Sequence, residues 1–207
     1  MKILVVGGTA GPGLAIARLA AARRHEVTVL ARDPGKGGGL LVGTRFVVGD
    51  VLDADDAGRA VAGQDAVVWA IGAPNRHSPL DTLSRGTRVL VEAMTRLAVG
   101  RLVALVREPR AVARGPLAAW AGRLAGAARD RAIDEDRERQ HALIESAGLE
   151  ATLVRVPAGG GRRGRATTDG SASLRPNPVT ADAIAAFVLG QLERPSAEAS
   201  GARPAAG

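Results

Sequence analysis

A glycine-rich turn joins a short apolar segment to a helix pattern within the first 24 residues. Residues 3–6 are four consecutive aliphatic side chains, as a buried parallel strand requires. The segment Gly7-Gly-Thr-Ala-Gly-Pro-Gly follows, and an amphipathic helix pattern covers residues 14–22. Glycines let the backbone turn tightly here, and the next helix presents its N-terminal N–H groups to negative charge. This order is typical of a dinucleotide-binding segment.

The spacing of this turn is Gly7-x-x-x-Gly11-x-Gly13 rather than Gly-x-Gly-x-x-Gly. A glycine trio alone is a weak signal, but one placed between a strand and a helix is a strong signal. The alternative is a strand-to-helix turn that binds nothing. We expect the cofactor to be bound here by Gly7, Thr9, Ala10, Gly11, Pro12 and Gly13.

Strand and helix patterns alternate along the rest of the chain, which predicts a parallel sheet covered by helices on both faces. Further strands are predicted at 27–31, 45–48, 65–71, 101–106 and 149–156. Helices are predicted at 53–62, 79–97, 116–128, 130–147 and 180–192, the last with Thr180 as its cap. We therefore predict an α/β fold, a doubly wound parallel sheet of the Rossmann type, in a single domain over residues 1–194. Residues 195–207 are mostly Pro, Ala, Gly and Ser, and we expect a disordered tail.

The charge balance argues against a nucleic-acid partner. The net charge is +7, but all but two of the 28 basic residues are arginine, and they are spread along the chain. Aromatic residues make up only 2% of the chain, so side chains for base stacking are scarce. The densest basic cluster is Arg162-Arg163-Gly-Arg165, which a solvated loop explains.

The sequence also points to a soluble, cytoplasmic protein. Cysteine is absent, which excludes disulfides, a thiol nucleophile and cysteine-ligated zinc. Nothing resembles a signal peptide, and no apolar run approaches the ~18 residues of a membrane span. The three histidines lie far apart without metal-ligand spacing, so no metal site is expected. We expect a small-molecule substrate, no membrane partner, and a monomer or weak homo-oligomer.

The residues that follow the second, third and fourth strands indicate which dinucleotide is bound. Arg32 follows the second strand, and an arginine there pairs with the 2′-phosphate of NADP. Asp33 comes next, and a carboxylate at this place accepts from the ribose hydroxyl of NAD, so that alternative stays open. A surface arginine with its neighbouring aspartate is a third interpretation. Further cofactor-binding candidates at strand ends are Asp50, Val51, Ala70, Ile71 and Gly72.

The chain contains no tyrosine. Many dehydrogenases of this fold use a Tyr-x-x-x-Lys pair, in which the lysine lowers the pKa of the phenol so that it exchanges a proton with the substrate. This protein cannot use that chemistry. A reductase built on this chain must rely on another acid, on solvent, or on an acceptor that needs no protein proton.

Several segments resemble the atypical short-chain dehydrogenases, in particular the NAD(P)H-binding, NmrA-like group and its flavin reductase, or biliverdin reductase B, members. The resemblance covers residues 2–193. It implies NADPH as cofactor and hydride transfer to a flavin, a tetrapyrrole or another planar or carbonyl acceptor. Besides the glycine turn, it is carried by His25-Glu-Val-Thr-Val-Leu-Ala-Arg-Asp-Pro, Gly49-Asp-Val-Leu-Asp, Val61-Ala-Gly-Gln-Asp-Ala-Val-Val, Leu143-Ile-Glu-Ser-Ala-Gly-Leu and Thr152-Leu-Val-Arg-Val-Pro.

The chain departs from this group at three places near the expected nicotinamide. Ala10 replaces the middle glycine of the family's loop. A Thr-Ser pair after the fifth strand is replaced by Val106-Arg107-Glu108. A histidine after the sixth strand is replaced by Ala158, which with Pro157 remains a cofactor-binding candidate. Flavin reduction needs mainly a stacked acceptor and protons from water, so these losses leave hydride transfer possible.

Arg107 is the catalytic candidate, because it could clamp an anionic substrate or the cofactor phosphates. His77 could donate a proton from a loop, and Trp120 could stack on a planar acceptor, although a solvated loop and a helix core explain them as well. The charged run 134–139 has the pattern of a solvated helix face. The main alternative function is a noncatalytic NADP(H)-binding sensor of the NmrA-like type, and a nucleotide-sugar epimerase is disfavoured by the missing tyrosine.

Overall fold

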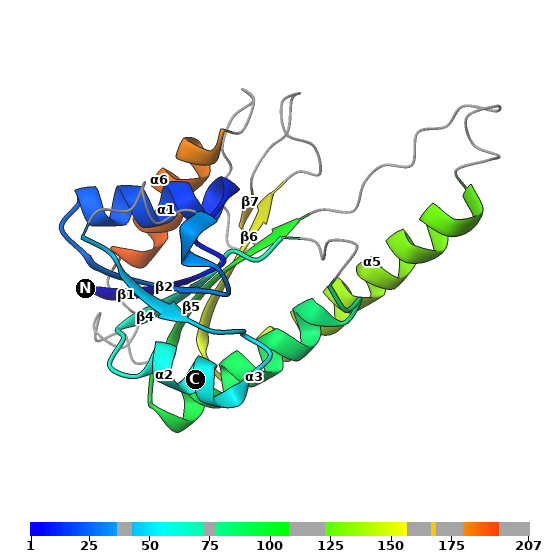
Figure 1. The fold of residues 1–207 in the computed structure, drawn as a ribbon, viewed down its shortest axis with the longest axis horizontal. Coiled ribbons are helices and arrows are strands. Elements are labelled where there is room, and N and C mark those ends of the chain that lie inside the picture. The colour runs from blue at the N-terminus through cyan, green and yellow to red at the C-terminus, as the bar shows by residue number, and fades with distance from the viewer. Residues whose placement is uncertain (37–42, 73–77, 108–122, 157–166, 169–179, 195–207) are drawn as a thin grey trace, which may run out of the picture.

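The computed structural model describes residues 1–36, 43–72, 78–107, 123–156, 167–168 and 180–194. These residues form one sheet with helices on both faces (Figure 1). The strands are β1 (Lys2–Val6), β2 (Glu26–Ala31), β3 (Arg45–Val48), β4 (Ala66–Trp69), β5 (Arg101–Arg107), β6 (Glu150–Val156) and β7 (Thr167–Thr168). The helices are α1 (Gly11–Ala22), α2 (Ala54–Val61), α3 (Thr82–Arg96), α5 (Arg123–Glu145) and α6 (Ala181–Leu192), with a short 3₁₀ turn η1 (Pro34–Lys36).

The strand order is β3-β2-β1-β4-β5-β6-β7, and the first six strands in this order are parallel. The chain moves outward from β1 to β3, then returns to the other side of β1 through β4. This reversal leaves a crevice at the carboxyl ends of β1 and β4, where ligands bind in open parallel sheets. The predicted doubly wound Rossmann fold is confirmed.

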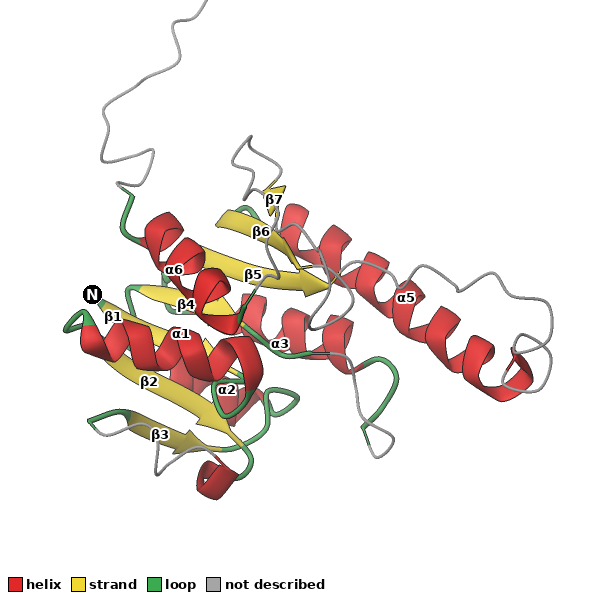
Figure 2. Cartoon of the chain, turned by 90° about the horizontal axis from the view of Figure 1, so that it is seen from above, coloured by secondary structure: helices red, strands yellow, loops and turns green. Residues whose placement is uncertain are grey.

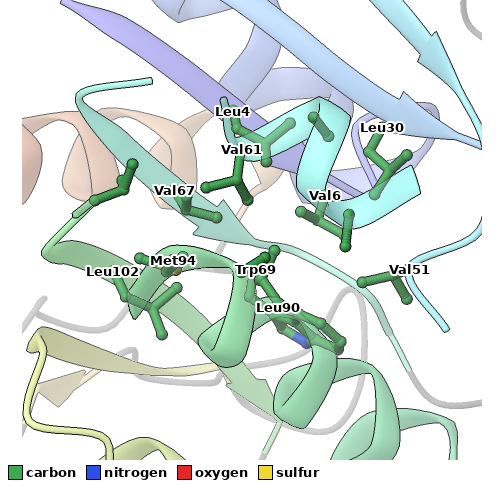
Figure 3. Packing of buried hydrophobic residues seen from close by; sticks show 14 of the residues in the cluster. Leu4, Val6, Leu30, Val51, Val61, Val67, Trp69, Leu90, Met94 and Leu102 are labelled. Carbon is green, nitrogen blue, oxygen red and sulfur yellow. The ribbon is translucent and has the colours of Figure 1, made fainter. Parts of the chain in front are cut away.

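Alternate residues of the central strands point into two separate cores. Ile3 and Val5 of β1 pack under α1 and α6, whereas Leu4 and Val6 face α2 and α3. Figure 2 shows α1 and α6 together over one face of the sheet. Figure 3 shows the opposite core, where the labelled side chains of β1, β4, β5, α2 and α3 converge. Burial on both faces explains why the central strands are continuously apolar.

Several predicted boundaries differ from the structure. The two helices predicted at 116–128 and 130–147 are wrong as a pair, because α5 runs without a break through Arg129 and Asp130. No proline separates the two patterns, and both residues are compatible with helix. Residues 116–122 lie outside the described residues. Helix α3 starts at Thr82 rather than Pro79, whose carbonyl oxygen instead accepts from the Thr82 N–H in the preceding turn.

Two further differences concern the ends of elements. Helix α1 begins at Gly11 rather than Leu14. Pro12 is its second residue, and proline is tolerated there because the N–H groups in the first turn of a helix have no acceptor within the helix. The antiparallel strand β7 has only two residues, and no hydrophobic pattern in the sequence indicated it. Thr180 caps α6 as predicted, since its hydroxyl accepts from the Ala183 N–H at 3.1 Å. In the described part of the chain, no helix is long and apolar enough to cross a bilayer.

Candidate functional site

A cleft of about 520 Å³ lies at the carboxyl ends of the central strands. The glycine turn after β1 forms one wall, and segments that follow β2, β3 and β4 form the others. Eleven of the residues predicted to bind the cofactor line it together: Gly7, Thr9, Ala10, Gly11, Pro12, Arg32, Asp50, Val51, Ala70, Ile71 and Gly72. The parallel sheet therefore gathers at one edge residues that are up to 65 positions apart in the sequence.

The glycine turn packs directly against the end of β4. Gly7 has a φ of +87°, which favours glycine, and a Cβ on it would lie 3.0 Å from the backbone of Ala70 and Ile71. Gly13 lies behind the turn and does not line the cleft. A Cβ on Gly13 would lie 2.3 Å from the carbonyl oxygen of Gly7. Gly13 therefore lets α1 approach the turn closely, which fixes the direction of its first N–H groups.

The N-terminus of α1 opens toward the cleft without a side-chain cap. The capping residue Ala10 offers no acceptor, and the first turn of α1 contains no acidic residue. The helix dipole places partial positive charge at this end. No carboxylate of this turn accepts from the first N–H groups of α1, so these groups are oriented to donate to an anion in the cleft.

The end of the cleft formed by the residues after β2 and β3 carries one exposed arginine and two aspartates. The Arg32 side chain is 65% exposed, and its Nη1 lies 4.0 Å from Asp50 Oδ2. Asp33 also lines the cleft, and its Oδ1 accepts from the Gly35 N–H at 3.0 Å. Asp33 thereby holds the η1 turn. Arg32 has the reach and the charge for a phosphate at this end.

Asp56 of α2 holds the segment that carries Asp50. The Asp50 N–H donates to Asp56 Oδ2 at 2.8 Å, and this hydrogen bond, together with the Arg59 guanidinium, keeps the pKa of the Asp56 carboxyl below its usual value. Residue 49 is glycine because a Cβ there would lie 2.5 Å from the Asp56 carboxyl group. Asp50 Oδ1 in turn accepts from the Leu52 N–H. Sequence reasoning missed Asp56, since it is one of several acidic residues in a short helix.

A smaller pocket of about 60 Å³, the side pocket, adjoins the cleft. Pro12, Ala70, Ile71 and Gly72 line both spaces, so the two are contiguous. Arg107, the predicted catalytic residue, lies in the side pocket rather than in the main cleft. The remaining lining residues are Leu83, Leu105, Arg137, Gln140 and Val156. Arg137 and Gln140 were not predicted, because nothing in the sequence shows which face of α5 meets α3.

The interpretation of residues 134–139 as a solvated face is wrong for Asp136, which is fully buried. Its carboxylate accepts from the Leu83 N–H at 2.9 Å, and from the N–H and hydroxyl of Ser84. These are the second and third residues of α3, whose N–H groups a capping side chain usually satisfies. Asp81, at the capping position, makes no such bond. Asp136 of α5 therefore caps α3 across the helix interface.

Some predicted site residues lie outside the described residues. These are Pro157, Ala158, Glu108, His77, Trp120 and the Arg162-Arg163-Gly-Arg165 cluster. The expected tail 195–207 also lies outside them. Within the described ranges, no three His, Cys, Asp or Glu side chains come together as candidate metal ligands.

The residues of the cleft fit a dinucleotide. Gly7 allows the turn to approach β4, Gly13 allows α1 to approach the turn, a helix N-terminus without acidic side chains borders the cleft, and Arg32 lines it after β2. The volume of about 520 Å³ is within the range of small-molecule sites.

The model of a family described as NAD(P)H-binding matches residues 7–195. Among solved structures, a Rossmann-fold NAD(P)-binding family protein from Shigella flexneri is 20% identical, with 95% of this chain and 88% of that chain covered and a TM-score of 0.67. ChuY, an anaerobilin reductase from Escherichia coli O157:H7, is 16% identical, with 94% and 92% covered and a TM-score of 0.64. WbmH from Bordetella bronchiseptica, solved with NAD⁺, is 18% identical, with 74% and 55% covered and a TM-score of 0.55. At these identities the similarity concerns the fold.

Proposed function

This chain belongs to the NAD(P)H-binding family, and on that premise we propose that it is an NADPH-dependent oxidoreductase of the flavin reductase type. Its acceptor is a flavin, a tetrapyrrole or another planar or carbonyl compound, reduced without a Tyr–Lys pair. The structural similarity to a protein described as an anaerobilin reductase supports this proposal, as does the resemblance to the NmrA-like group. The observation that carries it is the contiguity of the side pocket with the cleft at Ile71 and Gly72.

Each wall of the cleft has a separate task in this proposal. The turn at Gly7 and the N-terminus of α1 hold the pyrophosphate, and Arg32 pairs with the 2′-phosphate. Asp50 and Val51 border the adenine. When bound, NADPH supplies the hydride. An acceptor would stack on the nicotinamide within the cleft, beside the strand end at Ile71 and Gly72 that borders the side pocket, and would take its proton from water.

Absorbance at 340 nm tests the proposal directly. We expect the protein to oxidise NADPH in the presence of FMN, FAD or riboflavin, and not when the acceptor is omitted. Quinones and linear tetrapyrroles extend the acceptor series. Tight NADPH binding with no oxidation by any of these acceptors would contradict the enzyme proposal.

The missing tyrosine and the replacement Val106-Arg107 favour one other candidate, a noncatalytic NADP(H)-binding sensor. A sensor needs the cleft but no acceptor. It would bind NADPH and NADP⁺ with different affinities and would respond by a change in conformation or partner binding. The absorbance assay separates the two functions, because only the reductase consumes NADPH.

Arg32→Ala should weaken NADPH binding by about tenfold to a hundredfold while leaving NADH binding unchanged. A charge-assisted hydrogen bond contributes about 1.5–3 kcal/mol, which corresponds to that range. The measurement is the dissociation constant of each cofactor by isothermal titration calorimetry. Arg88→Ala, which removes an exposed arginine of α3, is the matched control. Equal losses for NADPH and NADH would show that Arg32 does not recognise the 2′-phosphate.

A further inference from the structure

The side pocket brings together two arginines from distant parts of the chain. Arg107 is exposed at the carboxyl end of β5, and Arg137 comes from the middle of α5. Both line the space that opens from the cleft past Ile71 and Gly72. Arginine presents a rigid fork of N–H donors that matches the geometry of a carboxylate. Two arginine side chains that line one pocket beside the cleft favour recognition of an anion.

The charge of this pair is only partly compensated. Arg137 is 13% exposed, and its Nη1 donates to Asp134 Oδ1. Among the residues that the structure describes, no carboxylate pairs with Arg107. The group of Arg107, Arg137 and Asp134 therefore carries a single net positive charge. A monoanion balances that charge, whereas a phosphate dianion would exceed it.

Apart from Arg107, Arg137 and Gln140, the walls of the pocket are apolar. Leu83, Leu105 and Val156 supply apolar surface, and Gln140 is held by a hydrogen bond from its Nε2 to Thr87 Oγ1 at 2.9 Å. A volume of about 60 Å³ holds a few water-sized groups, which suits a carboxylate and is too small for a flavin ring. The ring of an acceptor must therefore lie in the contiguous cleft.

We propose that the side pocket is a carboxylate subsite, in which Arg107 and Arg137 hold a carboxylate group of the acceptor. This inference rests on the proposed function, and within the acceptor series it favours compounds that carry a carboxylate over flavins, which carry none. Arg137 is oriented for this task by Asp134, and Arg107 supplies the charge that the carboxylate neutralises. The carboxylate keeps the acceptor in one orientation over the nicotinamide position.

The test uses benzoate as a carboxylate probe, benzamide as its uncharged counterpart and phenyl phosphate as a dianion. Binding of each probe to the full chain is measured by calorimetry, with and without saturating NADP⁺. We expect benzoate to bind at least tenfold more tightly than benzamide and phenyl phosphate. Arg107→Ala should weaken benzoate binding at least tenfold and leave NADP⁺ binding unchanged. Arg131→Ala, which removes another exposed arginine of α5, should change neither.

A second variant and a thermal melting curve separate loss of binding from loss of the fold. Arg137→Ala should weaken benzoate binding to a similar extent, and its thermal melting curve shows whether the unpaired Asp134 has disturbed α5. Equal binding of benzoate and benzamide would overturn the proposal. Tighter binding of phenyl phosphate than of benzoate would also overturn it. So would an Arg107→Ala variant that loses NADP⁺ binding but keeps benzoate binding, because Arg107 would then bind a phosphate group.

These outcomes are distinguishable from failure of the proposed function. Benzoate binding that depends on Arg107, combined with no oxidation of NADPH by any acceptor, would leave the carboxylate subsite standing and remove the reductase. Oxidation of NADPH by flavins, combined with equal binding of benzoate and benzamide, would support the reductase and remove the carboxylate subsite.

Discussion

Gly13→Ala should lower NADPH affinity by about a hundredfold and destabilise the protein by about 1–3 kcal/mol. The new methyl group would lie 2.3 Å from the Gly7 carbonyl oxygen, so either the turn or α1 must move. Overpacking at such a contact costs about 1–3 kcal/mol. A displacement of about 1 Å in a positioned group costs about a hundredfold in function. Calorimetry with NADPH and urea denaturation followed by circular dichroism measure the two effects.

Gly190→Ala is the matched control for this substitution. Gly190 lies in the last turn of α6, and a Cβ there would meet no atom within 4 Å. Alanine is the better helix former, so this variant should gain about 0.5–1 kcal/mol and bind NADPH as the wild type does. If Gly13→Ala kept wild-type affinity, the close packing of α1 behind the turn would not be what positions the phosphate-binding groups.

Asp136→Ala should cost about 3 kcal/mol of unfolding free energy. The substitution leaves the buried N–H groups of Leu83 and Ser84 without the acceptor that caps α3, and each buried unsatisfied donor costs about 1–3 kcal/mol. Asp136→Asn keeps an acceptor oxygen and should lose less. Urea denaturation under one set of conditions gives the unfolding free energies of the wild type, Asp136→Ala and Asp136→Asn.

Glu135→Ala removes an exposed carboxylate of the same helix and should change stability by no more than about 0.5 kcal/mol. If Asp136→Ala behaved like Glu135→Ala, Asp136 would not cap α3. Because Leu83 lines the side pocket, Asp136→Ala should also weaken benzoate binding in the protein that remains folded. This second effect links the cap of α3 to the wall of the proposed subsite.

The cleft could be predicted from the sequence because its parts are local signals. The glycine turn, Arg32 after β2 and Asp50 after β3 each stand at the end of an apolar run, and the ends of parallel strands meet at one edge. The side pocket could not be predicted in this way. Its residues come from α3, β5, α5 and β6, and no spacing relates them.

Residues 134–139 show most clearly why burial on a helix could not be predicted from the sequence. A run of mixed charges on a helix reads as a solvated face, and Glu135, Glu138 and Arg139 are indeed exposed. Asp136 is buried and Arg137 lines a pocket because α5 packs along α3, and that packing depends on the whole sheet. The same side chain can face water or a helix N-terminus without any change in the local pattern.

The amino-acid order alone was sufficient for the fold class, the order of the central elements and the glycine turn, because hydrophobic period and backbone freedom are properties of neighbouring residues. The capping of α3 by Asp136, the support of Asp50 by Asp56 and the placement of Arg107 and Arg137 around one pocket depended on the assembled fold. Polar contacts of this kind act over a few ångströms between elements far apart in the chain. They exist only after the sheet and its two helical layers have brought those elements together.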